Sequence, residues 1–423
     1  MAKAPISPLQ SVPRPAGRPP ALPSVDALVA RERPSEPLVC LRPAVIAAAS
    51  RRFVRAFPGE VLYAVKCNPE PRVLRAVWAG GVRHFDCASL PEIALVRRVL
   101  PQAELHFMHP VKSRPAIHSA FHQYGVADFA LDSTDELEKI LQETVRAVPV
   151  GTPPVLGLFV RLAVRQGGTY DLSGKFGVAV AEAAELLRLA RPHAARLGLC
   201  FHVGSQCLDP DAYSRAIASA GEAIAGSGVR VDIVDVGGGF PVSYPDAEPP
   251  PLDAYVAAIG QAAIGQTAIG QTAIGQTAVR LGRGVELWAE PGRALVAGGG
   301  SVVVQVQLRR DDALYINDGV YGSLSDAGHP GFRFPVRRVP IDGAAGSEAE
   351  LRPFALYGPT CDSADFMKGP FLLPDDIDEG DWIELGQLGA YGACLRTRFN
   401  GFDAALTAEV ADPPLLATPG YEL

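Results

Sequence analysis

The chain has 423 residues, of which 48% are hydrophobic and 20% charged, the balance of an ordinary globular protein with a large core. Its formal net charge of −7 argues against a nucleic-acid-binding protein, which normally carries a basic surface. We expect no membrane span, because no uninterrupted apolar run of about 18 residues occurs. The seven cysteines are scattered and form no CxxC pair, which argues against a disulfide framework or a metal site and favours a reducing cytoplasm.

The first 35 residues are predicted to form a disordered tail. They begin with MAKAPISPLQSVPRPAGRPPALPSV, which is rich in proline and lacks the apolar core of a signal peptide. The following segment, EPLVCL (36–41), predicts a β-strand. This strand either opens a first domain, which we expect to span residues 36–297, or joins the sheet of a second one.

Between residues 61 and 290 the sequence alternates strand-like and helix-like segments. The predicted strands are apolar runs at 61–66, 82–86, 103–109, 126–132, 154–162, 197–203, 230–236 and 284–290. Helical patterns separate most of them, for example at 91–100, 134–145 and 179–197. Eight apolar strands divided by helices predict an α/β fold with a parallel (βα)8 barrel, whose strands are covered on both faces. An open doubly wound sheet is the alternative.

One segment, IGQAAIGQTAIGQTAIGQTA (259–278), breaks this pattern with four tandem copies of a five-residue unit. Five residues advance an α-helix by about 140° beyond a full turn, so successive isoleucines cannot share one face. We therefore interpret the segment as a local duplication within a helix or surface loop and assign it no function.

The character of the sequence changes after about residue 298. Short β-type segments with turn residues between them follow, at 301–308, 313–318, 352–358 and 381–392, and helical periodicity is weak. We predict a second, mainly β domain over residues 298–423.

Polar residues recur where the predicted barrel strands end. The active site of a (βα)8 barrel lies at the C-terminal ends of its strands. The residues at or near these ends are Lys66, Asp86, His109, Asp132, Arg161, His202, Gly237, Gly238, Gly239, Glu290 and Arg293. Taken alone, each of these residues more often has a structural role, but their occurrence together at one end of the predicted barrel favours an enzyme active site.

The chemistry of this set favours a phosphate-bearing cofactor. Glycines directly after a strand let backbone N–H groups approach a phosphate closely, and Ser205 and Arg293 can complete the cup. A lysine at its base, Lys66, suggests pyridoxal phosphate bound as a Schiff base. Glu290 would then be the carboxylate that keeps the pyridine nitrogen protonated.

Nine motifs in order resemble the fold-type III pyridoxal-phosphate decarboxylases over roughly residues 36–402. They are YAVKCNP (63–69), FDCAS (85–89), GKFG (174–177), FHVGSQC (201–207), DVGGGFP (235–241), AEPGR (289–293), INDGVYGS (316–323), YGPTCDSAD (357–365) and LGAYG (388–392). The combination of FDCAS, GVYGS and GPTCD is most similar to the ornithine decarboxylase branch.

The resemblance implies a set of cofactor-binding residues. Lys66 would tether the cofactor and His202 would stack on its ring, while Glu290 would pair with the ring nitrogen. The other residues implied to hold the cofactor or its phosphate are Asp86, Glu92, Arg161, Ser205, Gly238, Gly239, Arg293 and Tyr391.

The resemblance also implies a homodimer in which the second domain of one subunit completes the site of the other. Cys361 would return a proton to the substrate after loss of CO₂. Asp362 would bind the distal ammonium of a basic amino acid, together with Tyr321 and with Asp326, which lies closer to GVYGS than the family pattern leads us to expect.

Several alternatives stay open. The aspartate after the cysteine favours ornithine over diaminopimelate, for which the family typically places glutamate there. Lysine differs from ornithine by one methylene, which is worth only about 1–3 kcal/mol in discrimination. An alanine-racemase-like enzyme would not need GPTCD. A catalytically inactive relative that binds a regulatory partner would be favoured by the loss of Lys66 or Cys361, and both are present.

Overall fold

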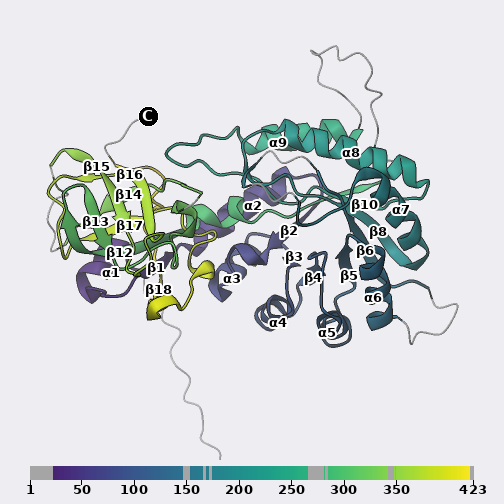
Figure 1. The fold of residues 1–423 in the computed structure, drawn as a ribbon, viewed down its shortest axis with the longest axis horizontal. Helices are drawn as coiled ribbons and strands as arrows, with labels where there is room; N and C mark the ends of the chain where they lie inside the picture. The colour runs from purple at the N-terminus through teal and green to yellow at the C-terminus, as the bar shows by residue number, and fades with distance from the viewer. Residues whose placement is uncertain are drawn as a thin grey trace, which may run out of the picture.

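We describe the fold from a computed structural model. The residues described are 22–145, 153–164, 168–170, 174–264, 281, 284–328, 330–341, 347 and 349–419. They form two domains, a barrel surrounded by helices and a separate mainly β domain, which lie side by side along the long axis of the molecule (Figure 1).

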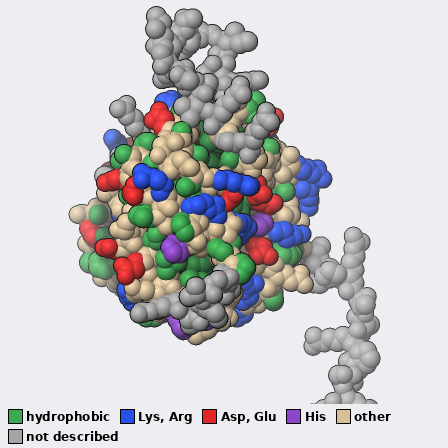
Figure 2. Space-filling view, turned by 90° about the vertical axis from the view of Figure 1, so that its right-hand side faces the viewer, with side chains coloured by type: hydrophobic (Ala, Val, Ile, Leu, Met, Phe, Trp, Pro, Cys, Tyr) green, Lys and Arg blue, Asp and Glu red, His purple; other side chains and the backbone are tan. Residues whose placement is uncertain are grey.

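The surface of the barrel end carries basic and acidic side chains intermixed, with no large field of one sign (Figure 2). Among the described residues, no helix is long and apolar enough to cross a membrane. The described part of the chain also contains no group of three or more His, Cys, Asp or Glu residues that could hold a metal ion.

Eight parallel strands close into a barrel in the order β2, β3, β4, β5, β6, β8, β10, β11 and back to β2. Their bounds are β2 (Glu60–Ala64), β3 (His84–Cys87), β4 (Glu104–Phe107), β5 (Asp128–Leu131), β6 (Leu156–Arg161), β8 (Ala194–Cys200), β10 (Ile233–Asp235) and β11 (Glu286–Ala289). Each falls within or overlaps a predicted strand. The (βα)8 prediction is therefore confirmed, and the open-sheet alternative is wrong.

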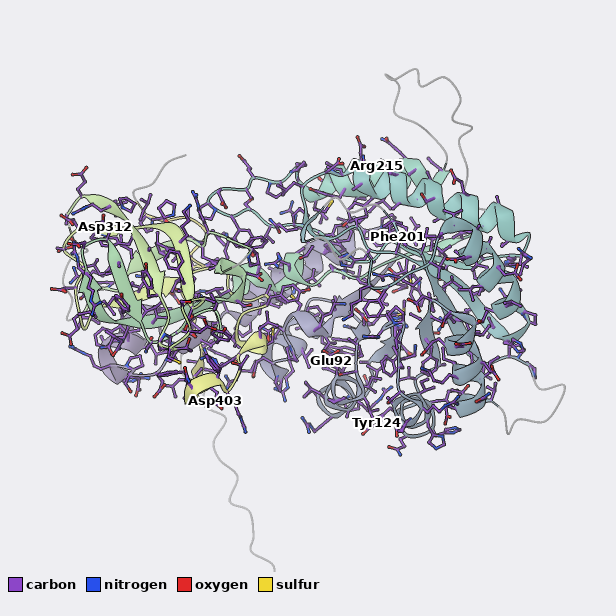
Figure 3. The ribbon with its side chains drawn as sticks, in the orientation of Figure 1. Glu92, Tyr124, Phe201, Arg215, Asp312 and Asp403 are labelled. Carbon is purple, nitrogen blue, oxygen red and sulfur yellow. The ribbon has the colours of Figure 1, made fainter. Side chains whose placement is uncertain are left out.

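Helices form the outer layer of this domain (Figures 1 and 3). They are α2 (Pro43–Ala56), α3 (Pro71–Ala79), α4 (Leu90–Val99), α5 (Arg114–Tyr124), α6 (Thr134–Thr144), α7 (Val180–Ala190), α8 (Asp211–Ser227) and α9 (Leu252–Ile264). Serine side chains cap the first turns of α4, α5 and α6 by accepting backbone N–H groups. The predicted helix 179–197 is too long. It ends before Pro192, and β8 begins at Ala194, because proline cannot continue a helix.

The β domain is built on one eight-stranded sheet, with β14, β17, β12, β13, β15 and β16 in spatial order, β1 paired with β12, and β18 paired with β1. The strands are β1 (Leu38–Leu41), β12 (Gly300–Arg310), β13 (Ala313–Ile316), β14 (Val336–Arg338), β15 (Leu351–Tyr357), β16 (Phe366–Pro374), β17 (Trp382–Leu385) and β18 (Leu406–Glu409). Strands β12, β13, β15 and β17 lie at the four predicted β segments. Strands β14, β16 and β18 were not predicted.

The N-terminal prediction needs a correction. Helix α1 (Val25–Glu32) buries Val25, Leu28 and Val29 against the β domain, so the disordered tail does not extend to residue 35. These positions have the i, i+3, i+4 spacing of one helix face, which gives the segment an apolar stripe to bury. Residues 1–21 lie outside the described residues. Strand β1 pairs with β12 and β18, which adds residues 38–41 to the sheet of the second domain.

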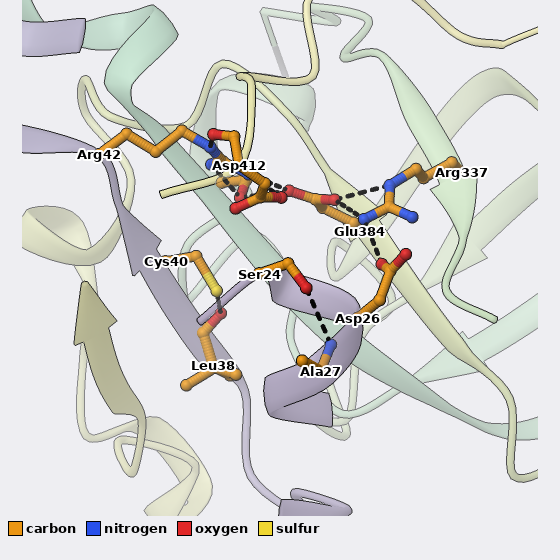
Figure 4. Close-up of polar contacts among 10 residues, drawn as sticks. Ser24, Asp26, Ala27, Leu38, Cys40, Arg42, Arg337, Glu384 and Asp412 are labelled. Atoms are coloured by element: carbon orange, nitrogen blue, oxygen red, sulfur yellow. Dashed lines mark hydrogen bonds and ion pairs between the residues drawn. The ribbon is translucent and has the colours of Figure 1, made fainter. Parts of the chain in front are cut away.

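A buried ion network joins this N-terminal segment to the sheet (Figure 4). The Arg42 guanidinium donates to Glu384 Oε1 at 2.9 Å, and the other oxygen of Glu384 accepts from Arg337 Nε at 2.8 Å. Arg337 also donates to Asp26 Oδ1 on α1 at 2.7 Å. Because Arg42 and Glu384 are both buried, their charges must be compensated within the network, Arg42 by Glu384 and Asp412 and Glu384 by Arg42 and Arg337.

The repeat begins inside α9. Ile259 is buried there, whereas Ile264, one repeat unit later, is 58% exposed. This agrees with the prediction that successive isoleucines cannot share one face. The remainder of the repeat lies outside the described residues.

Candidate active site

A cavity with an empty volume of about 300 Å³ opens at the C-terminal ends of the barrel strands. It is lined by Ala64, Lys66, His202, Ser205, Gly238, Gly239, Phe240, Glu290, Gly292, Arg293 and Tyr391. Eight of these were predicted to hold a cofactor. A larger hollow, of about 920 Å³, is lined by Asp246, Arg333, Lys368 and strand residues of the β domain, and none of the predicted site residues lies there.

Lys66 stands in a single 3-10 turn, η1 (Val65–Cys67), directly after β2. Its Nζ lies 2.9 Å from Asp86 Oδ2, and its side chain is 43% exposed in the cavity while that of Asp86 is 2% exposed. Burial alone would lower the pKa of Lys66, but the Asp86 and Glu290 carboxylates outweigh it and raise the pKa above its usual value. The lysine is therefore held as an ammonium ion at the cavity wall.

Glu290 follows β11 and contacts a second buried acid, Asp235, at the end of β10. Among the described residues, Asp235 Oδ2 and Glu290 Oε1 are buried and have no hydrogen-bond donor. Burial, with the nearby Asp235 and Asp86 carboxylates, raises the pKa of Glu290 well above its ordinary value. A proton held between the two carboxyl groups satisfies both buried oxygens.

His202 is held as a neutral ring beside the glycine loop. The Gly204 N–H donates to His202 Nδ1 at 2.9 Å, which leaves the ring proton on Nε2. Burial, together with the Arg161 and Lys66 charges, lowers the pKa of His202 well below its ordinary value. A neutral, flat imidazole is suited to packing against an aromatic ring.

The glycines after β10 lie too close to neighbouring protein atoms to carry a side chain. A Cβ on Gly238 would lie 2.7 Å from the Glu290 carbonyl oxygen and 3.0 Å from His202 Nε2. At Gly239, φ is +103°, a conformation that other residues rarely adopt. The Tyr213 hydroxyl donates to the Gly238 carbonyl at 2.9 Å and fixes the loop. The loop thus presents bare backbone to the cavity.

Arg293 begins α10 (Arg293–Val296) and is buried. It donates to the Tyr244 hydroxyl at 2.8 Å and to Asp326 Oδ2 at 2.9 Å, and its guanidinium carbon lies 4.9 Å from the Tyr391 ring centre. Asp326, expected near a substrate amine, is thus paired with the arginine of the cofactor cavity. A substrate contact of Asp326 stays a prediction.

The other predicted barrel residues make contacts of their own outside the cavity lining. Glu92 lies at the start of α4 (Figure 3). Its Oε2 accepts the Ala88 N–H at 2.7 Å, and burial raises its pKa. Arg161 ends β6 and contacts the Cys200 thiol. Asp132 accepts the Gly177 N–H at 2.9 Å. None of these residues lines the cavity, but Glu92 lies near Lys66 and Asp86, and Arg161 lies near Glu290.

Three predicted residues form a second cluster in the β domain. The Tyr321 hydroxyl donates to Asp362 Oδ2 at 2.5 Å, and Cys361 beside it is exposed. None of the three belongs to the lining of the Lys66 cavity in the single chain. The structure therefore separates the predicted site residues into a cofactor group and a substrate group.

Sequence reasoning missed three residues that shape the cavity. Asp235 stands in DVGGGFP, where its place at the end of a strand was the available signal. Tyr213 and Tyr244 reach the site from α8 and from a loop, and no motif marks them.

Family comparisons agree with this geometry. Residues 44–297 match the pyridoxal-binding domain of the pyridoxal-dependent decarboxylases, and residues 294–389 match their C-terminal sheet domain. The chain belongs to this family, the fold-type III decarboxylases. Its cofactor is pyridoxal phosphate, and several of its relatives are ornithine or lysine/ornithine decarboxylases.

Similar proteins fall in more than one functional class. Lysine/ornithine decarboxylase of Selenomonas ruminantium is 32% identical over 366 residues, covering 84% of this chain and 84% of that protein. Antizyme inhibitor 2 of Xenopus laevis is 30% identical over 387 residues, covering 83% and 76%. A solved structure of similar fold is that of lysine/ornithine decarboxylase from Vibrio vulnificus, complexed with putrescine. Its TM-score is 0.73 and its sequence identity 31%, and the match covers 91% of this chain and 97% of that one.

The residues present fit the cofactor. The bare backbone at Gly238 and Gly239 and the buried Arg293 suit a phosphate, and Arg293 Nε is buried without an acceptor among the described residues. Lys66 supplies the amine, and Glu290 offers a carboxyl group in the same cavity. Each part of pyridoxal phosphate therefore finds a group of suitable chemistry.

Proposed function

We propose that the protein decarboxylates L-ornithine to putrescine and CO₂, accepts L-lysine as a second substrate, and serves polyamine synthesis. The observation that carries the choice of substrate is the carboxylate of Asp362. A hydrogen bond from the Ala364 N–H, together with one from the Tyr321 hydroxyl, lowers the pKa of Asp362, so it is an anion at neutral pH. Such a group suits a distal ammonium and disfavours a distal carboxylate.

The mechanism assigns a task to each cavity residue. Bound pyridoxal phosphate supplies an electron sink for the electron pair left at Cα when CO₂ departs. Glu290 would hold a proton at the ring nitrogen of the bound cofactor, and the neutral His202 ring would be suited to pack against that ring. Lys66, which is paired with Asp86, would be the amine that tethers the cofactor and that the substrate amine replaces. Cys361 then donates its thiol proton to Cα.

We further propose a homodimer, because Cys361 and Asp362 must reach a Lys66 cavity that they do not line in their own chain. Exposed apolar side chains close to them in sequence or space support this. Leu395, Phe399 and Phe402 are 41%, 41% and 45% exposed, and the Phe399 ring lies 4.9 Å from that of Tyr321. A second copy of the chain would cover them.

Mixing two inactive variants tests the shared site. Lys66→Ala and Cys361→Ala, unfolded and refolded together, should recover about a quarter of wild-type activity, because half of the dimers are mixed and each mixed dimer has one intact site. Each variant refolded alone is the control. Activity that stays at the level of the separate variants would contradict a site shared between subunits.

The substrate is tested by mass spectrometry of amines formed from ornithine, lysine, arginine and meso-diaminopimelate, each supplied separately with pyridoxal phosphate. Putrescine, with or without cadaverine, is the expected result. Agmatine as the product would refute the choice of ornithine, and lysine formed from diaminopimelate would refute the argument from the charge of Asp362.

A second candidate is a non-catalytic regulator, which the similarity to an antizyme inhibitor favours. The absence of any amine product would support it.

We also propose a cytoplasmic location, because all seven cysteines are free and five of them are buried.

A further inference from the structure

Three loops of the β domain meet around Cys361. They are the loop 318–323 after β13, the loop 358–365 between β15 and β16, and the segment 396–401, which contains η6 (Phe399–Gly401). The Thr397 N–H donates to the Tyr321 carbonyl at 2.8 Å, which joins the third loop to the first. We call these segments the three-loop cluster.

Two buried aspartates fix the backbone of the three-loop cluster. Asp365 accepts the Val320 N–H at 2.8 Å and both the N–H and the hydroxyl of Thr360, at 3.0 and 2.8 Å. Asp318 accepts the Arg396 guanidinium at 2.7 Å. Each carboxylate thus joins two of the loops, and its burial makes the loss of either bond costly. Cys361 therefore stands on a rigid frame although it is exposed.

Asn400 makes the remaining link, from the third loop to Cys361 itself. Its side-chain Oδ1 accepts the Cys361 peptide N–H at 3.0 Å. Asn400 has φ 52° and ψ 9°, a left-handed conformation that asparagine, aspartate and glycine adopt more readily than other residues. This backbone conformation belongs to the turn that carries the carboxamide to Cys361.

We propose that Asn400 is a positioning residue for Cys361, holding its peptide so that the thiol faces the substrate Cα. The proposal rests on the proposed function, in which Cys361 is the proton donor. In the productive step a C–H bond forms at Cα as the S–H bond breaks, and the thiolate regains a proton from water. Proton transfer needs close alignment, and a displacement of about 1 Å can reduce a rate by about 10²-fold.

Misplacement of the thiol has a distinct chemical signature. If the proton is delivered to the cofactor carbon that was joined to the substrate nitrogen, hydrolysis releases an aminoaldehyde and pyridoxamine phosphate in place of the diamine and pyridoxal phosphate. The ratio of aminoaldehyde to diamine therefore reports where the proton goes. A general loss of folding lowers the yield of both products and leaves this ratio unchanged.

A matched pair of variants separates the acceptor from the backbone conformation. Asn400→Gly keeps the left-handed conformation accessible but removes the side-chain oxygen that accepts the Cys361 N–H. Asn400→Asp keeps the left-handed conformation accessible and also keeps an accepting oxygen. We expect Asn400→Gly to lower kcat about tenfold with little change in KM and to raise the aminoaldehyde-to-diamine ratio. We expect Asn400→Asp to restore kcat and the ratio toward wild type. Equal ratios in wild type and Asn400→Gly would overturn the proposal.

Hydrogen exchange of the cofactor-free protein gives a readout that does not depend on activity. The Cys361 amide should exchange faster in Asn400→Gly than in wild type, while Asn400→Asp retains its protection. Unchanged exchange in Asn400→Gly would refute the contact itself. If wild type forms no diamine but the exchange difference is present, the proposed function has failed and the contact stands. If wild type forms diamine and Asn400→Gly matches it in kcat and product ratio, the positioning role has failed.

Discussion

The contact between Asp235 and Glu290 predicts how the stability of the cofactor-free protein depends on pH. Burial, with a contribution from Asp86, raises the pKa of Asp235 from 3.8 to about 6. One pKa unit corresponds to about 1.4 kcal/mol, so this shift corresponds to about 3 kcal/mol. The folded protein binds the proton more tightly than the unfolded chain does. The stabilisation is therefore complete below pH 3.8 and is lost as the pH rises through 6.

Asp235→Asn should remove this pH dependence. Asparagine has the size of the protonated acid and keeps an oxygen for the Gly237 N–H, which lies 2.8 Å from Asp235 Oδ1, but it cannot ionise. At pH 8 the variant should be more stable than wild type by up to about 3 kcal/mol, and the difference should shrink toward zero near pH 4.

Urea unfolding of the cofactor-free protein at several pH values between 5 and 8 measures this difference. Asp311→Asn is the control: Asp311 is exposed and has a left-handed conformation that asparagine tolerates, so this variant should follow wild type at every pH. A constant difference between Asp235→Asn and wild type, or a destabilised variant at pH 8, would show that the two acids do not share a proton in the folded state.

Three further predictions follow from buried groups. Burial and a neighbouring histidine lower the pKa of His84 from 6.5 to about 4, so the folded protein loses stability relative to the unfolded chain as the pH falls below 6.5. His84→Gln cannot take up this proton. In urea titrations at pH 5 the variant should therefore lose about 2 kcal/mol less unfolding free energy to acid than wild type does. Gly238→Ala should weaken cofactor binding at least tenfold in an absorbance titration, because its Cβ would lie 2.7 Å from the Glu290 carbonyl oxygen, which is backbone and cannot move freely. Glu384→Ala should cost about 3–5 kcal/mol of unfolding free energy, since it removes the buried carboxylate that Arg42 and Arg337 share and leaves Arg42 only its longer contact with Asp412, and a loss below 1 kcal/mol would contradict that.

The barrel could be predicted from the sequence because its strands are buried on both faces. Such strands appear as unbroken apolar runs, and the polar residue that ends each run marks the active-site edge. Lys66, His202 and Glu290 were found by this rule alone, before any motif was considered. A local pattern was sufficient because the fold repeats the same strand and helix unit.

The remaining features depend on contacts between distant residues. Helix α1 follows a proline-rich stretch, and its apolar stripe is buried by contacts with residues of the β domain that are distant in sequence. Strand β16 is interrupted by Gly369 and Pro370, which usually mark the end of a strand. The pairing of Asp326 with Arg293 joins a loop of the β domain to the barrel, and no local pattern predicts it.

The division of the site between two domains bears on substrate length. Buried acids fix each half separately: Asp86 holds Lys66 on the barrel, and Asp365 holds the loop of Asp362 in the β domain. In the proposed dimer, the distance from Lys66 to Asp362 is then set by how the subunits pack, which no single side chain controls. An additional methylene in the substrate can be accommodated by a small shift of the interface. Since a methylene is worth only about 1–3 kcal/mol, we expect the preference between ornithine and lysine to respond to substitutions at the exposed Phe399 and Phe402 as well as at Asp362.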